Sequence, residues 1–417
     1  MNKKRLFTKT LVAAAVTIAS QQVMAAGFQL NAQSATGLGR AFAGDGVIAD
    51  NASTMAKNPA SMALFDAPAL SLGVIAIDTD VKVKDTTFMG QPVDNASIGG
   101  TSFAPNIYYI HPLNEKWTVG AGLYSNFGTK TEFKDGYGKN NKFMGLTPDI
   151  YGGLTDVKSV NLALSAAFRV NEHWSLGGGL DVVYGSGKFE RGRDLNIHPN
   201  HDNIVAIDAD GVALGYNLGT VYELNENNRF GLSYRYSPTI EAKGDIYHAL
   251  EGGNLNNQKL KIPLPDMAEF SGFNKLTDKF AVHYSIQWIR WSEFDLLTTT
   301  GGAEINDYHW QDGWHYSIGG TYYLNDTWTL RAGYMHDTSA QDERTSISVP
   351  DSARNWFSGG FSYHLDPKSS IDFGVTYLVG EDVKAVEGKS PQTPNGLLTA
   401  TTRANAWLYG IQYNRSF

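Results

Sequence analysis

Apolar and polar side chains alternate along much of the chain with the two-residue period of β-strands. In residues 405–417, large side chains such as Trp407 and Ile411 share one face, whereas Ala406 and Gln412 share the other. A soluble sheet would bury the aromatic face and expose charges, so a small, polar second face favours a strand between lipid and a polar lumen. The same alternation occurs in residues 280–288, 328–334 and 371–377. This pattern predicts an all-β membrane barrel.

A short polar turn recurs six times and predicts the number of strands. The turns begin at Leu113, Val170, Leu224, Leu276, Leu324 and Leu365, at spacings of 57, 54, 52, 48 and 41 residues. Each combines an apolar residue with an Asn/Asp/Glu-rich turn, which is typical of hairpins. Six such turns divide the chain into seven hairpins, so we expect a 14-stranded antiparallel transmembrane β-barrel.

Longer segments separate the short turns and are expected to form loops at the opposite, extracellular end. They are residues 83–102, 134–155, 192–210, 243–260, 296–312, 339–351 and 387–401. Pro263 and Pro265 follow the fourth of these loops, so the eighth strand should be bent or short.

The N-terminus has the pattern of an export signal. Lys3, Lys4 and Arg5 precede an apolar run at residues 11–20, and small residues lead to a cleavage point after Ala25. A membrane-anchor helix is the alternative, but the run is shorter than the ~18 residues that such a helix needs. Residues 1–25 are therefore expected to be a cleaved signal peptide that sends the chain to the bacterial outer membrane.

Residues 26–67 precede the predicted barrel, residues 68–417, and show no strand alternation. A barrel of this size leaks unless something fills its lumen. We therefore expect residues 26–67 to form an N-terminal plug, or hatch, inside the lumen. A disordered periplasmic tail is the alternative, and the apolar residues in the segment weigh against it.

Composition excludes several functional classes. The chain has 34 Lys and Arg, 42 Asp and Glu, a net charge of −8 and no Cys. The acidic balance argues against a nucleic-acid partner, and the absence of Cys excludes thiolate metal sites and cysteine nucleophiles. The segment Gly37-Leu-Gly39 follows no strand, so it is not a dinucleotide loop.

One predicted external loop holds a candidate metal group, His198, His201 and Asp202, whereas Asp208-Ala-Asp210-Gly211 lacks the remaining positions of a calcium loop. Such a group is more often a solvated loop tip than a metal site. We expect no metal, no cofactor and no enzymatic activity.

Several motifs resemble the FadL/TodX family of outer-membrane channels. They are Ala26-Gly-Phe-Gln-Leu-Asn31, Gly37-Leu-Gly-Arg-Ala-Phe42, Asn58-Pro59-Ala60, Ser125-Asn126-Phe127-Gly128, Phe189-Glu190-Arg191 and Val349-Pro350-Asp351. The resemblance covers nearly the whole mature chain. It implies a monomeric barrel with a hatch and an internal acyl-chain pocket, embedded in outer-membrane lipid and lipopolysaccharide. The implied substrate is a long-chain fatty acid or another hydrophobic small molecule. A general diffusion porin, a hydrocarbon-specific uptake channel and a surface receptor for a phage or host remain alternatives.

A dry pocket in the lumen requires apolar side chains that point inward. Ile289 and Trp291 have the inward parity of their strand, and Phe28 and Leu30 of the plug are expected to complete the pocket. Arg191 also has inward parity, so its guanidinium is expected to bind the ligand carboxylate, a role that the resemblance implies as well. A surface pair with Glu190 or Asp194 is the alternative. A second basic contact of the family is not apparent at residues 309–312.

Two motifs have predicted conformational roles. Asn58-Pro59-Ala60 should form a fixed turn in the plug, because Pro restricts the preceding residue and Asn bonds nearby backbone. Alternation is clean up to Leu123 and ends at Ser125-Asn126-Phe127-Gly128. We expect this stretch to bend into the lumen and open a gap for lateral release of ligand, as in the family. The alternative is that the strand simply ends there.

Overall fold

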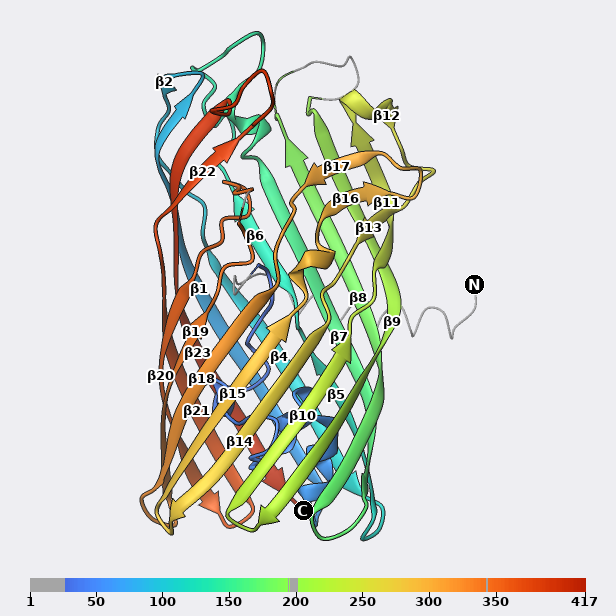
Figure 1. Ribbon diagram of the computed structural model, residues 1–417, viewed down its shortest axis with the longest axis vertical. Coiled ribbons are helices and arrows are strands. Elements are labelled where there is room, and N and C mark those ends of the chain that lie inside the picture. Colours follow the sequence, from blue (N-terminus) through green and yellow to red (C-terminus); the bar gives the residue numbers. More distant parts are fainter. Residues whose placement is uncertain (1–26, 194, 196–201, 343) are drawn as a thin grey trace.

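The computed structural model describes residues 27–193, 195, 202–342 and 344–417. Strands with opposite directions form one closed, elongated barrel (Figure 1). In order around the wall they are β1 (Ala69–Phe88), β4 (Thr101–Pro112), β5 (Trp117–Tyr124), β7 (Leu154–Arg169), β8 (Trp174–Arg191), β9 (Val205–Asn225), β10 (Asn228–Tyr236), β14 (Met267–Thr277), β15 (Phe280–Ile289), β18 (Gly313–Tyr323), β19 (Trp328–Asp337), β20 (Arg354–Asp366), β21 (Ser369–Gly380) and β23 (Leu398–Ser416). β23 pairs with β1 and closes the wall. These fourteen strands, counted over the described residues, confirm the predicted architecture. The predicted signal peptide, residues 1–25, lies outside the described residues.

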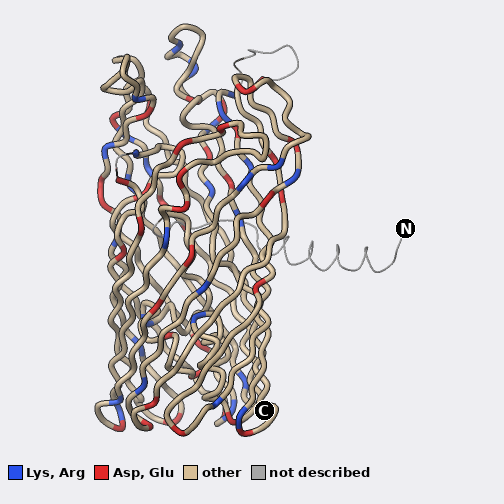
Figure 2. The backbone as a smooth tube through the Cα atoms, turned by 45° about the vertical axis from the view of Figure 1, so that its right-hand side comes forward, with Lys and Arg blue, Asp and Glu red and all other residues tan. Residues whose placement is uncertain are grey.

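Side-chain burial along the strands follows the predicted alternation. On β23, Trp407 and Tyr409 are 43% and 51% exposed, whereas Ala406 and Gln412 are buried. The large aromatic side chains therefore face outward and the small or polar ones face inward. Charged positions are most frequent in the loop-bearing part and in the turns at the other end (Figure 2). No helix among the described residues is long and apolar enough to cross a membrane.

The repeated turns lie at the end of the barrel that also holds the C-terminus (Figure 1). In three of them, an Asn side-chain oxygen accepts the N–H groups two and three residues later, at 2.8–2.9 Å. These residues are Asn114, Asn171 and Asn325. The Asn mimics a backbone turn, which explains why the sequence repeats it.

The opposite end carries the longer connections and several short elements. They are β2 (Gln91–Pro92), β3 (Ala96–Ser97), β6 (Gly128–Glu132), η3 (Pro148–Ile150), β11 (Ile240–His248), η4 (Ala249–Glu251), β12 (Gly253–Asn254), β13 (Leu260–Ile262), η5 (Trp291–Glu293), β16 (Leu296–Thr299), β17 (Glu304–Asp307) and β22 (Val383–Glu387). β13 pairs with both β11 and β16, and β16 pairs with β17, so these strands form a small sheet at this end. The eighth wall strand, β14, has 11 residues, whereas its neighbours β10 and β15 have 9 and 10, so the expectation of a short strand after Pro263 and Pro265 is wrong.

The N-terminal segment, residues 27–66, is enclosed by the wall strands (blue in Figure 1). It contains α2 (Ala35–Leu38), η1 (Ala52–Ala56) and η2 (Pro59–Leu64). The segment bonds to strands on several sides of the barrel. Thr36 donates to Asp372 of β21, Gly44 N–H to Ser285 Oγ of β15 at 3.0 Å, and Asn58 Nδ2 to Thr220 O of β9 at 3.1 Å. These contacts hold it in the middle of the lumen.

Candidate functional site

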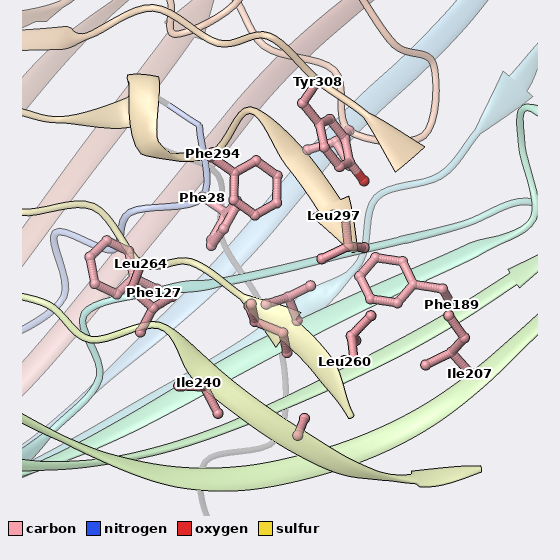
Figure 3. Packing of buried hydrophobic residues seen from close by; sticks show 14 of the residues in the cluster. Phe28, Phe127, Phe189, Ile207, Ile240, Leu260, Leu264, Phe294, Leu297 and Tyr308 are labelled. Carbon is pink, nitrogen blue, oxygen red and sulfur yellow. The ribbon is translucent and has the colours of Figure 1, made fainter. Parts of the chain in front are cut away.

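A large cluster of buried apolar side chains lies inside the barrel near its loop-bearing end. Its members come from the N-terminal segment, from the wall and from the small sheet of β11, β13 and β16 (Figure 3). They include Phe28, Phe127, Phe189, Ile207, Ile240, Leu260, Leu264, Ile289, Trp291, Phe294, Leu297, Tyr308 and Trp310. We call this cluster the apolar pocket.

The ring of Phe28 occupies the centre of the apolar pocket. Its centroid lies 4.6 Å from that of Trp291, 4.9 Å from that of Phe294 and 5.8 Å from that of Trp310. The first two contacts are edge-to-face, which is a favourable arrangement for aromatic pairs. Gly27 has a φ of +62°, and a Cβ there would lie 2.6 Å from Trp291. The Phe28 ring is therefore enclosed by the other aromatic side chains of the cluster.

The structure brings together three of the four residues expected to line the pocket. Phe28, Ile289 and Trp291 belong to it, and Ile289 and Trp291 are fully buried. Leu30 instead packs in a separate cluster with Leu38 and Phe42, so the structure does not place it in the pocket. The reason is that side chains two residues apart on an extended segment are almost 7 Å apart along the chain.

Sequence reasoning missed Phe294 and Trp310 as pocket residues. Both follow the end of β15, where strand parity no longer indicates direction. The sequence feature that could have identified each of them is an aromatic residue within an otherwise polar loop. Trp310 lies in the stretch considered for a second basic contact, and its neighbour His309 faces Asp295 and Asp307.

Arg191 lies at the rim of the apolar pocket, at the end of β8. Its ladder partner is Val205, a member of the pocket. The guanidinium donates to Leu154 O at 2.5 Å, Glu190 O at 2.8 Å and Thr155 Oγ1 at 2.6 Å. All three acceptors are uncharged.

Over the described residues, Arg191 makes no ion pair with a carboxylate. The Glu190 carboxylate lies 3.4 Å from Lys188 Nζ instead. Asp194, the other partner considered for a surface pair, lies outside the described residues. Among the residues that the structure describes, this partly buried cation therefore has no carboxylate within ion-pair distance.

Glu387, at the end of β22, is one of two carboxyl groups whose charge acts on Arg191; the other is Asp149. Burial raises the pKa of Glu387 to about 7, although the Ile347 N–H, Ser346 and the Arg191 charge each act to lower it. The Ile347 N–H donates to Glu387 Oε1 at 2.8 Å. This carboxyl group therefore changes its charge near neutral pH.

Residues 125–127 connect β5 to β6 and bond both to the N-terminal segment and to the wall, where the Ser159 N–H of β7 donates to Phe127 O at 2.9 Å. β5 ends at Tyr124 and β6 begins at Gly128. Between them, Asn126 O accepts the Leu30 N–H at 2.6 Å, and the Gly128 N–H donates to Phe28 O at 2.8 Å. The Phe127 ring lies in the apolar pocket.

The ladder of hydrogen bonds between β4 and the next strand is interrupted at residues 125–127. The β4–β5 ladder stops at Ile107 and Leu123, and the upper half of β4, Thr101 to Asn106, pairs with β1. β6 pairs with β7. Over the described residues, no ladder joins β4 to β6. Between β6 and the segment before β4, we find one backbone hydrogen bond in the described residues, from the Glu132 N–H to Ile98 O at 3.4 Å.

Asn58-Pro59-Ala60 fastens the N-terminal segment to the wall. Asn58 caps η2, with Oδ1 accepting the Ala60 N–H at 3.0 Å and Pro59 at the first helical position. A Cβ on Gly219 of β9 would lie 2.0 Å from Asn58 Oδ1. This close approach requires glycine in the facing strand.

The metal candidate falls mostly outside the described residues, since His198 and His201 are not among them. Over the residues that the structure does describe, no group of three or more His, Cys, Asp or Glu side chains is placed to hold a metal.

Comparison with known proteins gives a consistent match over the full chain. Residues 16–417 match the family model described as outer membrane protein transport protein (OMPP1/FadL/TodX). The long-chain fatty acid transport protein of Escherichia coli K12 is 35% identical over 463 residues, covering 100% of both chains. Outer membrane protein P1 of Haemophilus influenzae is 35% identical over 465 residues, covering 99% of both.

Solved structures share the fold. The crystal structure of a Pseudomonas aeruginosa FadL homologue has a TM-score of 0.81 at 21% identity, covering 94% of this chain and all of that one. The Pseudomonas putida toluene transporter TodX has a TM-score of 0.66 at 17% identity, with coverage of 94% and 100%.

Proposed function

The chain belongs to the OMPP1/FadL/TodX family of outer-membrane transport proteins, and from this we propose a mechanism by which it takes up hydrophobic compounds. It is an outer-membrane transport protein for long-chain fatty acids or other hydrophobic compounds, not an enzyme. The substrate that we propose is a long-chain fatty acid, and the route is passive. We propose that one barrel works alone, with its aromatic outer face in lipid and its loop-bearing end among lipopolysaccharide.

We propose that the apolar pocket binds the alkyl chain of the ligand. Transfer of each CH₂ group from water to a dry site is favourable by ~0.8 kcal/mol, so a long chain gains most from a fully apolar pocket. A water-lined porin lumen offers no such gain. The burial of Ile289, Trp291 and Phe294 around the Phe28 ring supports this assignment.

Arg191 is proposed to bind the carboxylate head group. A guanidinium next to apolar surface needs an anion, and a carboxylate matches its planar donors. The observation that carries the proposal is the position of this unpaired cation at the rim of the apolar pocket, because the two together match an amphiphile. A hydrocarbon-specific channel would have no use for the charge.

The exit route that we propose is lateral, through the wall between β4 and β6. Release into the periplasm would return the alkyl chain to water, at a cost of ~0.8 kcal/mol per CH₂, whereas release into the bilayer keeps it dry. The missing ladder between these strands supports the route, since no ladder of backbone hydrogen bonds needs to break and only the 3.4 Å bond from the Glu132 N–H to Ile98 O is in the way.

The N-terminal segment is proposed to act as the plug that keeps the lumen closed to water. Its contacts with β9, β15 and β21 support a closed resting state rather than a general diffusion porin. Ligand passage then requires the segment, and Phe28 in particular, to move.

The test replaces Arg191 and compares charged with neutral ligands. We expect Arg191→Gln to weaken oleate binding about tenfold or more, since hydrogen bonds to charged groups are worth ~1.5–3 kcal/mol. Binding of a neutral alkane of equal length should be unchanged. Lys188→Gln is the matched control, because Lys188 lies on the same strand with a side chain that is 45% exposed. Equal losses for both ligands would contradict the carboxylate assignment.

Uptake of labelled oleate and of toluene, in cells lacking their own transporter, tests the substrate class. Oleate uptake without toluene uptake is the expected result. The opposite result would favour a hydrocarbon-specific channel.

A further inference from the structure

A second cavity, polar rather than apolar, lies next to the apolar pocket between the N-terminal segment and the wall. It is small, with a volume of about 20 Å³ that has room for one or two water molecules, and it is lined on one side by Gln29, Gln33 and Lys57. Asn126 of the bent stretch also lines it, and Met267 belongs to both the cavity and the apolar pocket. The cavity therefore adjoins the pocket, the N-terminal segment and the bend in the wall.

Lys57 is a buried cation with unused donors. Its side chain is only 7% exposed. Its ammonium donates to Asn31 Oδ1 at 3.3 Å, and Glu269 Oε2 is 3.7 Å away, beyond hydrogen-bond length. Because an ammonium has three donors, these contacts leave Lys57 able to bind an additional acceptor.

The other charged side chains of the cavity, Glu269 and Arg235, already have hydrogen-bond partners. Glu269 accepts from Ser271 Oγ at 2.9 Å and from Gln287 Nε2 at 3.2 Å, so its carboxylate is bonded without Lys57. Arg235, the other cation of the cavity, is bonded to Asp181, to Ala56 O and to Tyr124 Oη. Lys57 is therefore the cation of this cavity that is open to a ligand.

Two side-chain oxygens in the cavity wall have no hydrogen-bond partner. They are Oε1 of Gln29 and of Gln33, residues that are 1% and 4% exposed. The amide nitrogens of both are bonded, to Gln287 and to Leu30 and Asn126 respectively. Buried acceptors of this kind are normally satisfied by water, so the cavity is suited to a hydrated polar group.

We propose that this polar cavity is a second binding site for the ligand carboxylate, with Lys57 as its cationic contact. In the resting state the cavity has room only for water, so the carboxylate enters when Gln29 moves away together with its neighbour Phe28 and widens the space beside Lys57. The proposal rests on the proposed function, because it places the same ligand at a later position on its path. The head group would move from Arg191 past Phe28 and Gln29 to Lys57, beside the bend at Asn126.

The physical need for such a site comes from the cost of moving a charge through the barrel. Transfer of an ionised carboxylate from water to an apolar site without a partner costs several kcal/mol of free energy. A cation in a hydrated cavity next to the wall opening lowers this cost while the alkyl chain leaves sideways. Without it, the head group would have to remain at Arg191.

The competing explanation is that Lys57 only tethers the N-terminal segment to Glu269. The two explanations predict opposite effects for one variant. If Lys57 binds the ligand, Glu269→Gln removes a competing carboxylate and strengthens binding at the second site. If Lys57 is a tether, Glu269→Gln and Lys57→Met remove the same contact and have the same effect.

The experiment follows ¹³C-carboxyl-labelled palmitate bound to the full-length protein in detergent micelles, by NMR. We expect two bound carboxyl resonances, of which Arg191→Gln abolishes one. Lys57→Met should weaken the other about tenfold or more, Lys57→Arg should restore it, and Glu269→Gln should strengthen it. Lys57→Gln serves if the Met variant does not fold.

The possible failures are distinguishable. A single bound resonance that Arg191→Gln removes would overturn the second site and leave the proposed function standing. The same would hold if Lys57→Met and Glu269→Gln changed the second resonance equally. Absence of any palmitate binding by the native chain would overturn the proposed function itself.

Discussion

Truncation of the Phe28 side chain is expected to let the protein bind shorter fatty acids than the native chain binds. Phe28 is 1% exposed, and its ring lies within 4.6–6.2 Å, centroid to centroid, of four other aromatic rings in the apolar pocket. An alkyl chain must therefore displace this ring before it can occupy the pocket. Phe28→Ala removes the occupant and leaves the pocket open.

The size of the effect follows from the burial of the ring. Truncation of a buried Phe to Ala costs ~3–5 kcal/mol, which approximates what a ligand must offset to displace the ring. At ~0.8 kcal/mol per CH₂, this corresponds to about four to six methylene groups. We therefore expect Phe28→Ala to bind fatty acids shorter by about that many carbons with the affinity that the native chain has for the longer ones.

The assay is calorimetric titration of the purified protein with saturated fatty acids of increasing length. Phe103→Ala is the matched control, because Phe103 lies on the outer face of β4 and is 53% exposed. Phe28→Leu should give an intermediate shift. Weaker binding of every chain length by Phe28→Ala would refute the reasoning, since Phe28 would then be a ligand contact and not an occupant that the ligand replaces.

Three further predictions concern the mouth, the wall and the N-terminal segment. Because the pKa of Glu387 is raised to about 7, its stabilising contribution is present at acid pH and lost as the pH rises through 7. Oleate affinity should fall over the same pH range, because Glu387 then carries a negative charge that acts on Arg191. If the Glu387→Gln variant showed the same fall in affinity with pH, Glu387 would not be its cause. A reversible disulfide that joins β6 to the upper half of β4 should abolish oleate uptake and preserve binding; the chain has no Cys of its own to interfere, and unchanged uptake would exclude the lateral route. Deletion of residues 26–66 should leave a folded barrel with a stable single-channel conductance, and a silent barrel would show that the segment is not the plug.

The wall of the barrel could be predicted from the sequence because its determinants are local. In three of the short turns an Asn bonds backbone two and three residues away, so the residues that form the turn are adjacent in the sequence. The inward and outward faces also follow from period-two alternation, as Trp407 and Gln412 illustrate. Strand number and sidedness needed no long-range information.

The interior was less predictable because long-range contacts determine it. Phe294 and Trp310 enter the apolar pocket from connections beyond the end of β15, where parity gives no direction. Leu30 has the parity of Phe28 but packs in another cluster, because the two side chains are almost 7 Å apart along an extended segment and each meets different neighbours. The spare donors of Lys57 become evident only when residues 269 and 287 are seen beside it.

The seam between the first and last strands also sets an order of events during assembly of the barrel. β1 and β23 are paired from Ala69 and Ser416 to Phe88 and Leu398, so the barrel closes by joining the two ends of the chain. Such a contact between distant residues has a large loop-closure cost and forms late. The N-terminal segment directly precedes β1 and bonds to β9, β15 and β21, so its contacts also join distant parts of the chain and are expected to form late. If β1 and β23 paired before the N-terminal segment had entered the lumen, the barrel would close around an unfilled lumen and the segment would remain outside it.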